Sequence, residues 1–278
     1  MKKILIALSL IVAFAACGSD NGNKTNGPSP IELQTSFAPN IKGVWVLTDY
    51  VDDLGKTKSP KASSDKLQGI VSMDIDPEIV SGDSAIVSAS LNNHEGYTFY
   101  LMYRQGQDDR SLVTAHTDPD NSGNFYELGY TTENGENTVT LNHYDKDKKL
   151  LDKRTFTKVT GPQSDNGEPY SLTYMANKIL FSGSYSVTDE HGKTTEATFS
   201  DDGLVSGIGD HTTYYVFTDF IGDEETNLDE MLFDEHTKNQ KGYIFEISGD
   251  TTRLYRAMEN DDRTQLIRGE LKYTMVKK

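Results

Sequence analysis

Cysteine is almost absent from this sequence: one, Cys17, occurs among 278 residues. A chain with a single thiol has no intramolecular disulfide and no zinc site built from several thiolates. If Cys17 is itself modified, no cysteine is left to act as a nucleophile. The folded part of the chain must therefore be stabilised by packed cores and not by covalent cross-links.

Long hydrophobic runs are also missing. The longest apolar stretch covers residues 4–16, which is 13 residues, whereas a helix that spans a bilayer needs about 20. Lys2 and Lys3 precede this stretch, and the small residues Ala15 and Ala16 end it, as in a secretory signal. The sequence therefore predicts a signal peptide over residues 1–16, export of the protein and no transmembrane helix.

The position of Cys17, directly after Ala15 and Ala16, resembles the lipobox of bacterial lipoproteins, with Phe14 where that family usually has leucine. The resemblance implies that the thiol receives a diacylglyceryl group, that cleavage occurs just before it, and that the new amino terminus is acylated by a fatty acid such as palmitate. Two or three acyl chains hold a protein stably in a membrane. We expect residues 17–30 to be the lipidated cysteine and a flexible tether, anchored in the cell envelope and most simply in the outer membrane. An ordinary cleaved signal is the alternative.

Positive charge is scarce. The chain has 27 lysines and arginines against 43 aspartates and glutamates, a net charge of −16. Such a surface repels nucleic acid and anionic lipid at long range. We therefore expect no nucleic-acid partner, and we expect the membrane to be contacted through the lipid anchor at Cys17.

The chain beyond the tether is longer than one modest core usually organises, which favours two domains. Residues 160–169 are rich in Gly, Pro, Asn, Asp and Ser and indicate a linker. We predict a first domain over 31–160, a linker with a short helix over 161–177 and a second domain over 178–278. Similar features recur in the same order on both sides of the linker: 41–47 matches 181–187, 97–103 matches 212–218, 124–130 matches 242–248, and 150–159 matches 266–276.

These segments have the alternating pattern of antiparallel strands with one buried face. Asn134-Gly135, His191-Gly192 and Asp202-Gly203 separate such segments where a tight hairpin needs Gly or Asn. One helix is predicted, because Leu172, Met175, Ala176 and Ile179 have helical spacing. The fold class is therefore all-β, as two tandem antiparallel β-barrels or as β-sandwiches.

A Gly43-x-Trp45 entry to the first strand, a chain of hairpins and a final strand ending RTFTKV resemble the lipocalin-like domains of bacterial surface lipoproteins. The resemblance covers residues 42–158 and, more weakly, 178–278. It implies that Trp45 packs across the barrel floor beside Arg154 of the last strand. The second half carries Tyr185 where the first carries tryptophan.

Sequence motifs for catalysis and cofactors are missing. The six histidines are spread singly, and no P-loop, dinucleotide loop or serine-nucleophile motif occurs. We predict no cofactor and no catalytic residue. Asp118, Asp120 and Ser122 match the first positions of a calcium loop, but Gly129 replaces the last ligand, a glutamate. A polar turn is the preferred interpretation there, and a solvated loop is preferred for the acidic segment 219–235.

Aromatic side chains are the remaining candidates for a binding site. In a sheet they form the core, but in an open-mouthed barrel they line a cavity for an apolar ligand. We predict a non-catalytic, membrane-anchored envelope lipoprotein that binds a small apolar or amphiphilic ligand or a glycan. The alternatives are an interaction or structural module with filled barrels, which engages another envelope protein, and a secreted hydrolase. The candidate ligand-binding residues are Trp45, Tyr97, Phe99, Tyr214, Tyr243 and Phe245.

Overall fold

The computed structural model of the chain describes residues 27–118, 120–161, 171–220 and 227–278. The predicted signal peptide and Cys17 lie outside these residues. The described helices are α1 (Pro30–Ile41), α2 (Thr48–Thr57), the 3-10 helix η1 (Ser64–Lys66) and α3 (Ser171–Leu180). The strands of the first half are β1 (Gly43–Leu47), β2 (Ile70–Ser81), β3 (Ser84–Leu91), β4 (Glu95–Gln105), β5 (Ser111–Thr117), β6 (Phe125–Glu133), β7 (Glu136–Tyr144) and β8 (Leu150–Lys158). Those of the second half are β9 (Gly183–Asp189), β10 (Thr194–Phe199), β11 (Val205–Ser206), β12 (Tyr214–Val216), β13 (Glu230–Phe233), β14 (Lys241–Ser248), β15 (Thr251–Glu259) and β16 (Leu266–Lys277).

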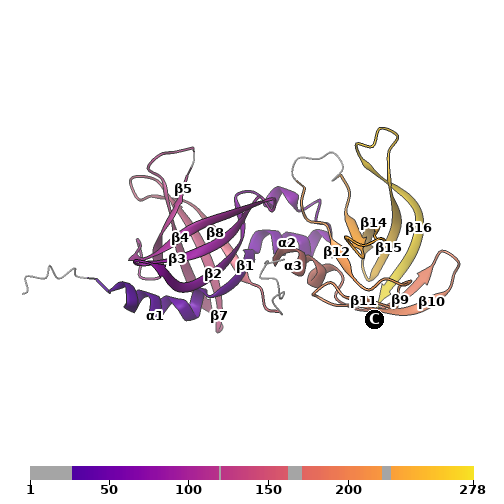
Figure 1. The fold of residues 1–278 in the computed structure, drawn as a ribbon, viewed down its shortest axis with the longest axis horizontal. Coiled ribbons are helices and arrows are strands. Elements are labelled where there is room, and N and C mark those ends of the chain that lie inside the picture. Colours follow the sequence, from indigo (N-terminus) through magenta and orange to yellow (C-terminus); the bar gives the residue numbers. More distant parts are fainter. Residues whose placement is uncertain (1–26, 119, 162–170, 221–226) are drawn as a thin grey trace, which may run out of the picture.

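The first half is a closed antiparallel barrel in which each strand pairs with its neighbours in sequence, and β1 pairs with both β2 and β8 (Figure 1). The Asn134-Gly135 turn between β6 and β7 has positive φ at both residues, as predicted for a tight hairpin. The predicted all-β fold is confirmed, and for the first half the barrel is confirmed over the sandwich.

Helix α1 covers one end of the barrel (Figure 1), packing against β2, β4 and β7. Its start is specified locally: Ser29 and Glu32 form a reciprocal capping box, and Pro30 occupies the first helical turn. The helix buries Leu33, Phe37 and Ile41, and the Phe37 ring meets the Tyr130 ring of β6 edge-on at 5.2 Å. Thus α1 closes the end of the barrel at which β6 passes into β7.

The sequence analysis predicted one helix, and this is confirmed as α3. It missed α1 and α2. α2 follows β1 without a break and buries only Tyr50 and Leu54, so its apolar face is too short to produce a clear helical period. α1 contains Pro39 near its end, and this residue obscures the helical pattern.

The second half is an eight-stranded antiparallel sheet in the order β11-β10-β9-β16-β15-β14-β13-β12, and it does not close. The prediction of two tandem barrels is therefore not confirmed. The two edges approach each other at one isolated bridge, Leu204↔Thr213. The physical reason for the opening is that β11 has two residues and β12 three, which is too short for a continuous ladder between them.

The matched segments of the two halves occupy the same places in the strand order. Residues 41–47 and 181–187 contain the first strand of each half, 97–103 and 212–218 the fourth, 124–130 and 242–248 the sixth, and 150–159 and 266–276 the last. In both halves the first strand pairs with the last. The halves therefore share a strand plan and differ at the join between the third and fourth strands.

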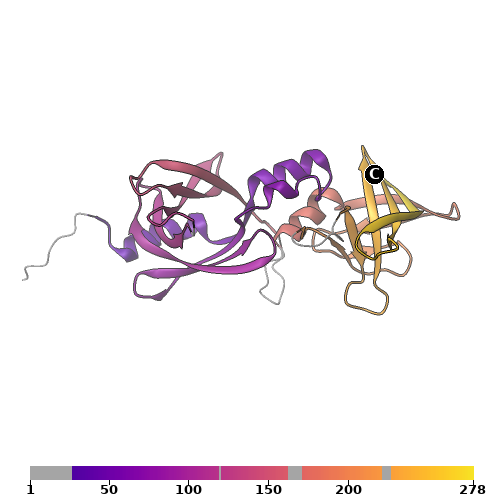
Figure 2. The ribbon, with the colours of Figure 1, turned by 90° about the horizontal axis from the view of Figure 1, so that it is seen from above.

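The two halves meet through α2, α3 and several polar contacts. Figure 2 shows α2 and α3 lying between the barrel and the second sheet. Asn93 in the β3–β4 turn donates to the backbone oxygen of Thr218 at 2.8 Å, and the backbone NH of Lys61 donates to the Asp229 carboxylate at 2.7 Å. Tyr50 of α2 is fully buried, and its hydroxyl has no hydrogen-bond partner among the described residues. No helix in the described part of the chain is long and apolar enough to cross a membrane.

Candidate functional site

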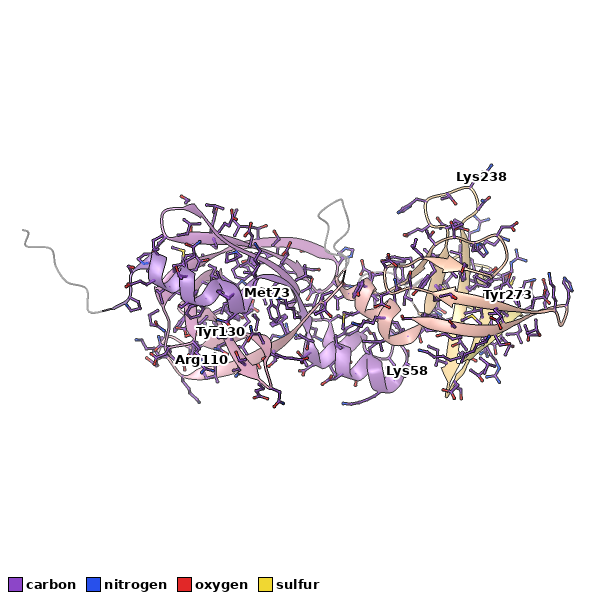
Figure 3. All side chains as sticks on the ribbon, turned by 90° about the horizontal axis from the view of Figure 1, so that it is seen from below. Lys58, Met73, Arg110, Tyr130, Lys238 and Tyr273 are labelled. Atoms are coloured by element: carbon purple, nitrogen blue, oxygen red, sulfur yellow. The ribbon has the colours of Figure 1, made fainter. Side chains whose placement is uncertain are left out.

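The interior of the barrel is filled by side chains. Along β4, Phe99, Leu101 and Tyr103 point inward and are at most 3% exposed. Inward residues of other strands, such as Met73 (labelled in Figure 3), belong to the same core. α1 covers one end of the barrel. We call the opposite end, at which β1 passes into α2 and the β3–β4 turn contacts Thr218, the mouth.

The mouth is lined by one inward side chain from each of five consecutive strands. On β6, Tyr126 lies four residues before Tyr130, on the same face but away from the α1 end. The neighbouring strands place their own inward residues beside it. We call this set the mouth cluster: Tyr97 (β4), His116 (β5), Tyr126 (β6), His143 (β7) and Arg154 (β8), all of them partly exposed.

Four members of the mouth cluster are rings that lie side by side on neighbouring strands. Tyr126 lies between the two histidines, with ring centres 4.3 Å from His116 and 4.2 Å from His143, the latter nearly parallel. The Tyr97 hydroxyl lies 3.0 Å from His116 Nδ1. Spacings of this size are those of adjacent strands, so the rings stand in a row along the wall of the barrel.

Asp118, directly after β5, lies beside His143 at one end of this row of rings. Its carboxylate accepts hydrogen bonds from the backbone NH of Asp120 and from Asn124 Nδ2, at 2.9 and 3.0 Å. These bonds hold the pKa of Asp118 below its usual value. His143 Nε2 lies 3.2 Å from the same carboxylate, although without the alignment of a hydrogen bond.

His116 is held in its neutral form. Burial and the neighbouring His143 lower the pKa of His116 to about 4, against a smaller opposing effect of Asp118. When the Tyr97 hydroxyl donates to Nδ1, the ring proton lies on Nε2, and His116 then offers a hydrogen-bond donor. His116 can therefore donate a hydrogen bond to a polar group of a ligand without a change of its own protonation near neutral pH.

Arg154 completes the cluster from the last strand. Its Nη1 donates to the backbone oxygens of Gln68 and Ile70, the second at 3.0 Å. The resemblance to lipocalin-like domains implied that Arg154 packs beside Trp45, and this is wrong. Lys158 takes that place, with its Nζ 5.5 Å from the centre of the Trp45 ring, because Lys158 is the residue of β8 that pairs directly with Trp45.

The predicted ligand-binding residues are not brought to one place. Of the six, Tyr97 lies in the mouth cluster, and Phe99 lies directly below it, 5.5 Å from the His116 ring. Trp45 is fully buried at the α1 end, where its Nε1 donates to the backbone oxygen of Ile41. The remaining three belong to the core of the second half and are at most 5% exposed: Tyr214, Tyr243 and Phe245.

The calcium-loop candidates do not converge in the described structure. Asp118 is engaged by Asp120, Asn124 and His143 as described above, while Asp120 and Ser122 are exposed. No group of three or more His, Cys, Asp or Glu side chains in the described ranges is arranged to hold a metal ion.

The contact between His116, Tyr126 and His143 was not predicted from the sequence, because these residues are separated by ten or more positions and form no motif. A usable signal was present. His143 alternates with the inward residues Val139 and Leu141, and an inward polar ring on consecutive strands marks the end of a barrel core.

An open groove of about 460 Å³ lies beside α1. Its lining includes the apolar residues Ala38, Pro39 and Pro77 and the lysines Lys42 and Lys158. It lies at the opposite end of the barrel from the mouth cluster.

Comparison with known proteins adds no identification: a scan against protein-family models, a search of curated proteins and a search of solved structures each gave no match for this chain.

Proposed function

We propose that this protein is a lipid-anchored, non-catalytic protein of the bacterial cell envelope, with lipocalin-like domains, that binds a small amphiphilic ligand or a glycan at the mouth of its barrel. The anchor is the lipobox-like Cys17, and the site is the mouth cluster. An envelope location would expose this site to molecules brought to the cell surface.

The observation that carries this proposal is the row of partly exposed polar rings above a filled interior. Inside the barrel, Phe99, Leu101 and Tyr103 leave little room for a long acyl chain. At the mouth, by contrast, Tyr97, His116 and the other cluster members present hydroxyl and imidazole groups on rigid strands. Convergent polar groups on a rigid scaffold beside apolar surface are typical of a site for a small ligand. The ligand therefore binds at the rim and not deep in the barrel.

Native mass spectrometry tests this proposal. The full chain, in nanodiscs of phosphatidylcholine, is exposed to a lipid and glycan extract of the source organism, and bound small molecules are detected by mass. We expect an adduct on the wild type that is lost in the double variant His116→Ala/His143→Ala. The control is His191→Ala, at a hairpin of the second half, which should keep the adduct. An adduct that survives the double variant would place the ligand elsewhere.

The second candidate function is an interaction or structural module that engages another envelope protein. It is favoured by the filled interior, since a barrel packed by its own side chains serves as a scaffold and not as a container. Cross-linking of the protein in cells separates the two. A single, reproducible protein partner together with a bare mass in the extract experiment would favour this candidate.

A further inference from the structure

Arg154 differs from the other members of the mouth cluster because it carries a permanent charge that no carboxylate neutralises at close range. Among the described residues, no Asp or Glu oxygen lies within ion-pair distance of its guanidinium group. Asp152 and Asp49 act on it only from further away, and burial lowers its pKa. A partly buried guanidinium group normally has a close anionic partner.

Another carboxylate beside the mouth cluster, Asp118, is already engaged. Asp118 accepts from the backbone of Asp120 and from Asn124, and it faces His143 on the other side. The carboxylates that act on Arg154 from a distance are instead those of Asp152 and Asp49.

The backbone holds the guanidinium group in a fixed position. Nη1 donates to the oxygens of Gln68 and Ile70, on either side of Gly69. Gly69 has φ +66°, and a Cβ atom there would lie 2.9 Å from Nη1, so only glycine allows this approach. Asn92 fixes the same segment, since its side-chain oxygen accepts from Gly69 N at 2.7 Å. Of the guanidinium nitrogens of Arg154, only Nη1 has a hydrogen bond to the described residues. The N–H groups of Nε and Nη2 are therefore left for a ligand.

We propose that Arg154 binds an acidic group of the ligand, a carboxylate or a phosphate, at the mouth of the barrel. This inference rests on the proposed function and narrows it to acidic ligands. The planar guanidinium fork matches both groups and binds them with charge-assisted hydrogen bonds. Tyr126 and the histidines on β5 and β7 would contact the uncharged part of the ligand.

The net charge of −16 does not prevent this. Repulsion between exposed charges is largely screened beyond about 8 Å at physiological ionic strength. The electrostatic energy of an acidic ligand bound at the mouth is therefore set mainly by the nearby guanidinium group. The net charge instead slows its association, and the rate should rise with added salt.

The test compares matched acidic and neutral probes on the full chain in phosphatidylcholine nanodiscs, by isothermal titration calorimetry. The pairs are glucuronate with glucose and dodecanoate with dodecanol, and inorganic phosphate is tested alone. The variant is Arg154→Gln. Its control is Lys153→Gln, which removes the same charge from the adjacent, outward-facing position of β8.

We expect an acidic probe to bind the wild type and Lys153→Gln roughly tenfold more tightly than its neutral partner, and Arg154→Gln to remove this preference. Preference for glucuronate or for dodecanoate over its neutral partner identifies the source of the acidic group as a glycan or a fatty acid. Binding of inorganic phosphate that is lost in Arg154→Gln identifies it as a phosphate ester. Equal binding of acid and neutral partner by the wild type would overturn the role of Arg154 while leaving the mouth site intact. Absence of binding by every probe would overturn both. If Arg154→Gln does not fold, the wild-type comparison of each pair still decides, and Arg154→Lys, which keeps the charge without the fork, replaces it.

Discussion

Lys158 lies over the ring of Trp45, with Nζ 5.5 Å from the ring centre, across the strand pair that closes the barrel. The second half repeats this arrangement: Lys277 Nζ lies 6.0 Å from the centre of the Tyr185 ring, across the pairing of β9 with β16. In each half the strand begins with a glycine at positive φ, and the lysine packs against it. A Cβ on Gly43 would lie 3.3 Å from the Lys158 side chain.

This arrangement predicts that Gly43→Ala destabilises the protein. Gly43 has φ +115°, which an L-residue adopts only with strain, so we expect a loss of about 1–3 kcal/mol in the free energy of unfolding. The matched control is Gly96→Ala on β4, where φ is not positive and a Cβ would meet no atom within 4 Å. Urea unfolding measures both variants. Similar values for the two would show that the conformation at Gly43 does not require glycine.

The proposed lipid anchor predicts that Cys17→Ala removes acylation. Because a single thiol is available and stable anchoring takes two or more acyl chains, the variant should incorporate no labelled palmitate. Its barrel and second sheet should still fold, as judged by circular dichroism. Metabolic labelling followed by immunoprecipitation makes the measurement, and a labelled variant would exclude Cys17 as the acylation site.

Glu127 is a fully buried carboxylate that holds the β4–β5 connection. The backbone NH of Gln107 donates to both of its oxygens, at 2.8 and 3.0 Å, and the Ser111 hydroxyl donates at 2.7 Å. In Glu127→Gln the new amide NH2 faces donors, so we expect a loss of about 1–3 kcal/mol in the free energy of unfolding. Glu136→Gln, at the exposed start of β7, is the control and should be neutral. A neutral Glu127→Gln would mean that water satisfies these donors.

Strand alternation and turn residues made the all-β fold and the hairpins predictable. The order of features also anticipated which segments occupy equivalent strands of the two halves. That the second sheet does not close was not predictable. Its closure depends on the lengths of β11 and β12, and strands this short contain too few residues to show a periodic pattern in the sequence. Helix α2 was missed because its buried face is short, and α1 because Pro39 near its end obscures the helical pattern.

The candidate site was predictable only in part. Tyr97 was among the predicted ligand-binding residues, whereas His143 was not. What assembles the site is register: β6 pairs with β7 so that Tyr126 lies opposite His143. Register between strands is set by the whole barrel, and the spacing of residues in one chain does not reveal it.

The buried carboxyl group of Glu230 predicts that the free energy of unfolding falls as pH rises. Burial raises the pKa of Glu230 to about 7, above its ordinary value of 4.5. Between these values the folded chain holds the proton and the unfolded chain does not, so the residue contributes stability at low pH that is lost as pH rises through 7. Glu230→Gln removes this loss, and its stability relative to the wild type should increase from pH 4.5 to pH 8. Thermal unfolding at a series of pH values measures it, with Glu246→Gln, exposed on β14, as the control.

His116 predicts a change of the opposite sign: the free energy of unfolding rises with pH, over a pH range that overlaps with that of Glu230. Its pKa is lowered to about 4 by burial and by His143, from an ordinary value of 6.5. Between these values the unfolded chain binds the proton and the folded chain does not, so the free energy of unfolding falls as pH falls from 6.5 to 4. His116→Asn cannot titrate, so its stability relative to the wild type should rise as pH falls through this range. His191→Asn, on an exposed turn, should show no such trend. Because Glu230 acts in the opposite direction, the free energy of unfolding of each variant is compared with that of the wild type at the same pH. If the difference between His116→Asn and the wild type did not change with pH, the imidazole would be solvated at the mouth.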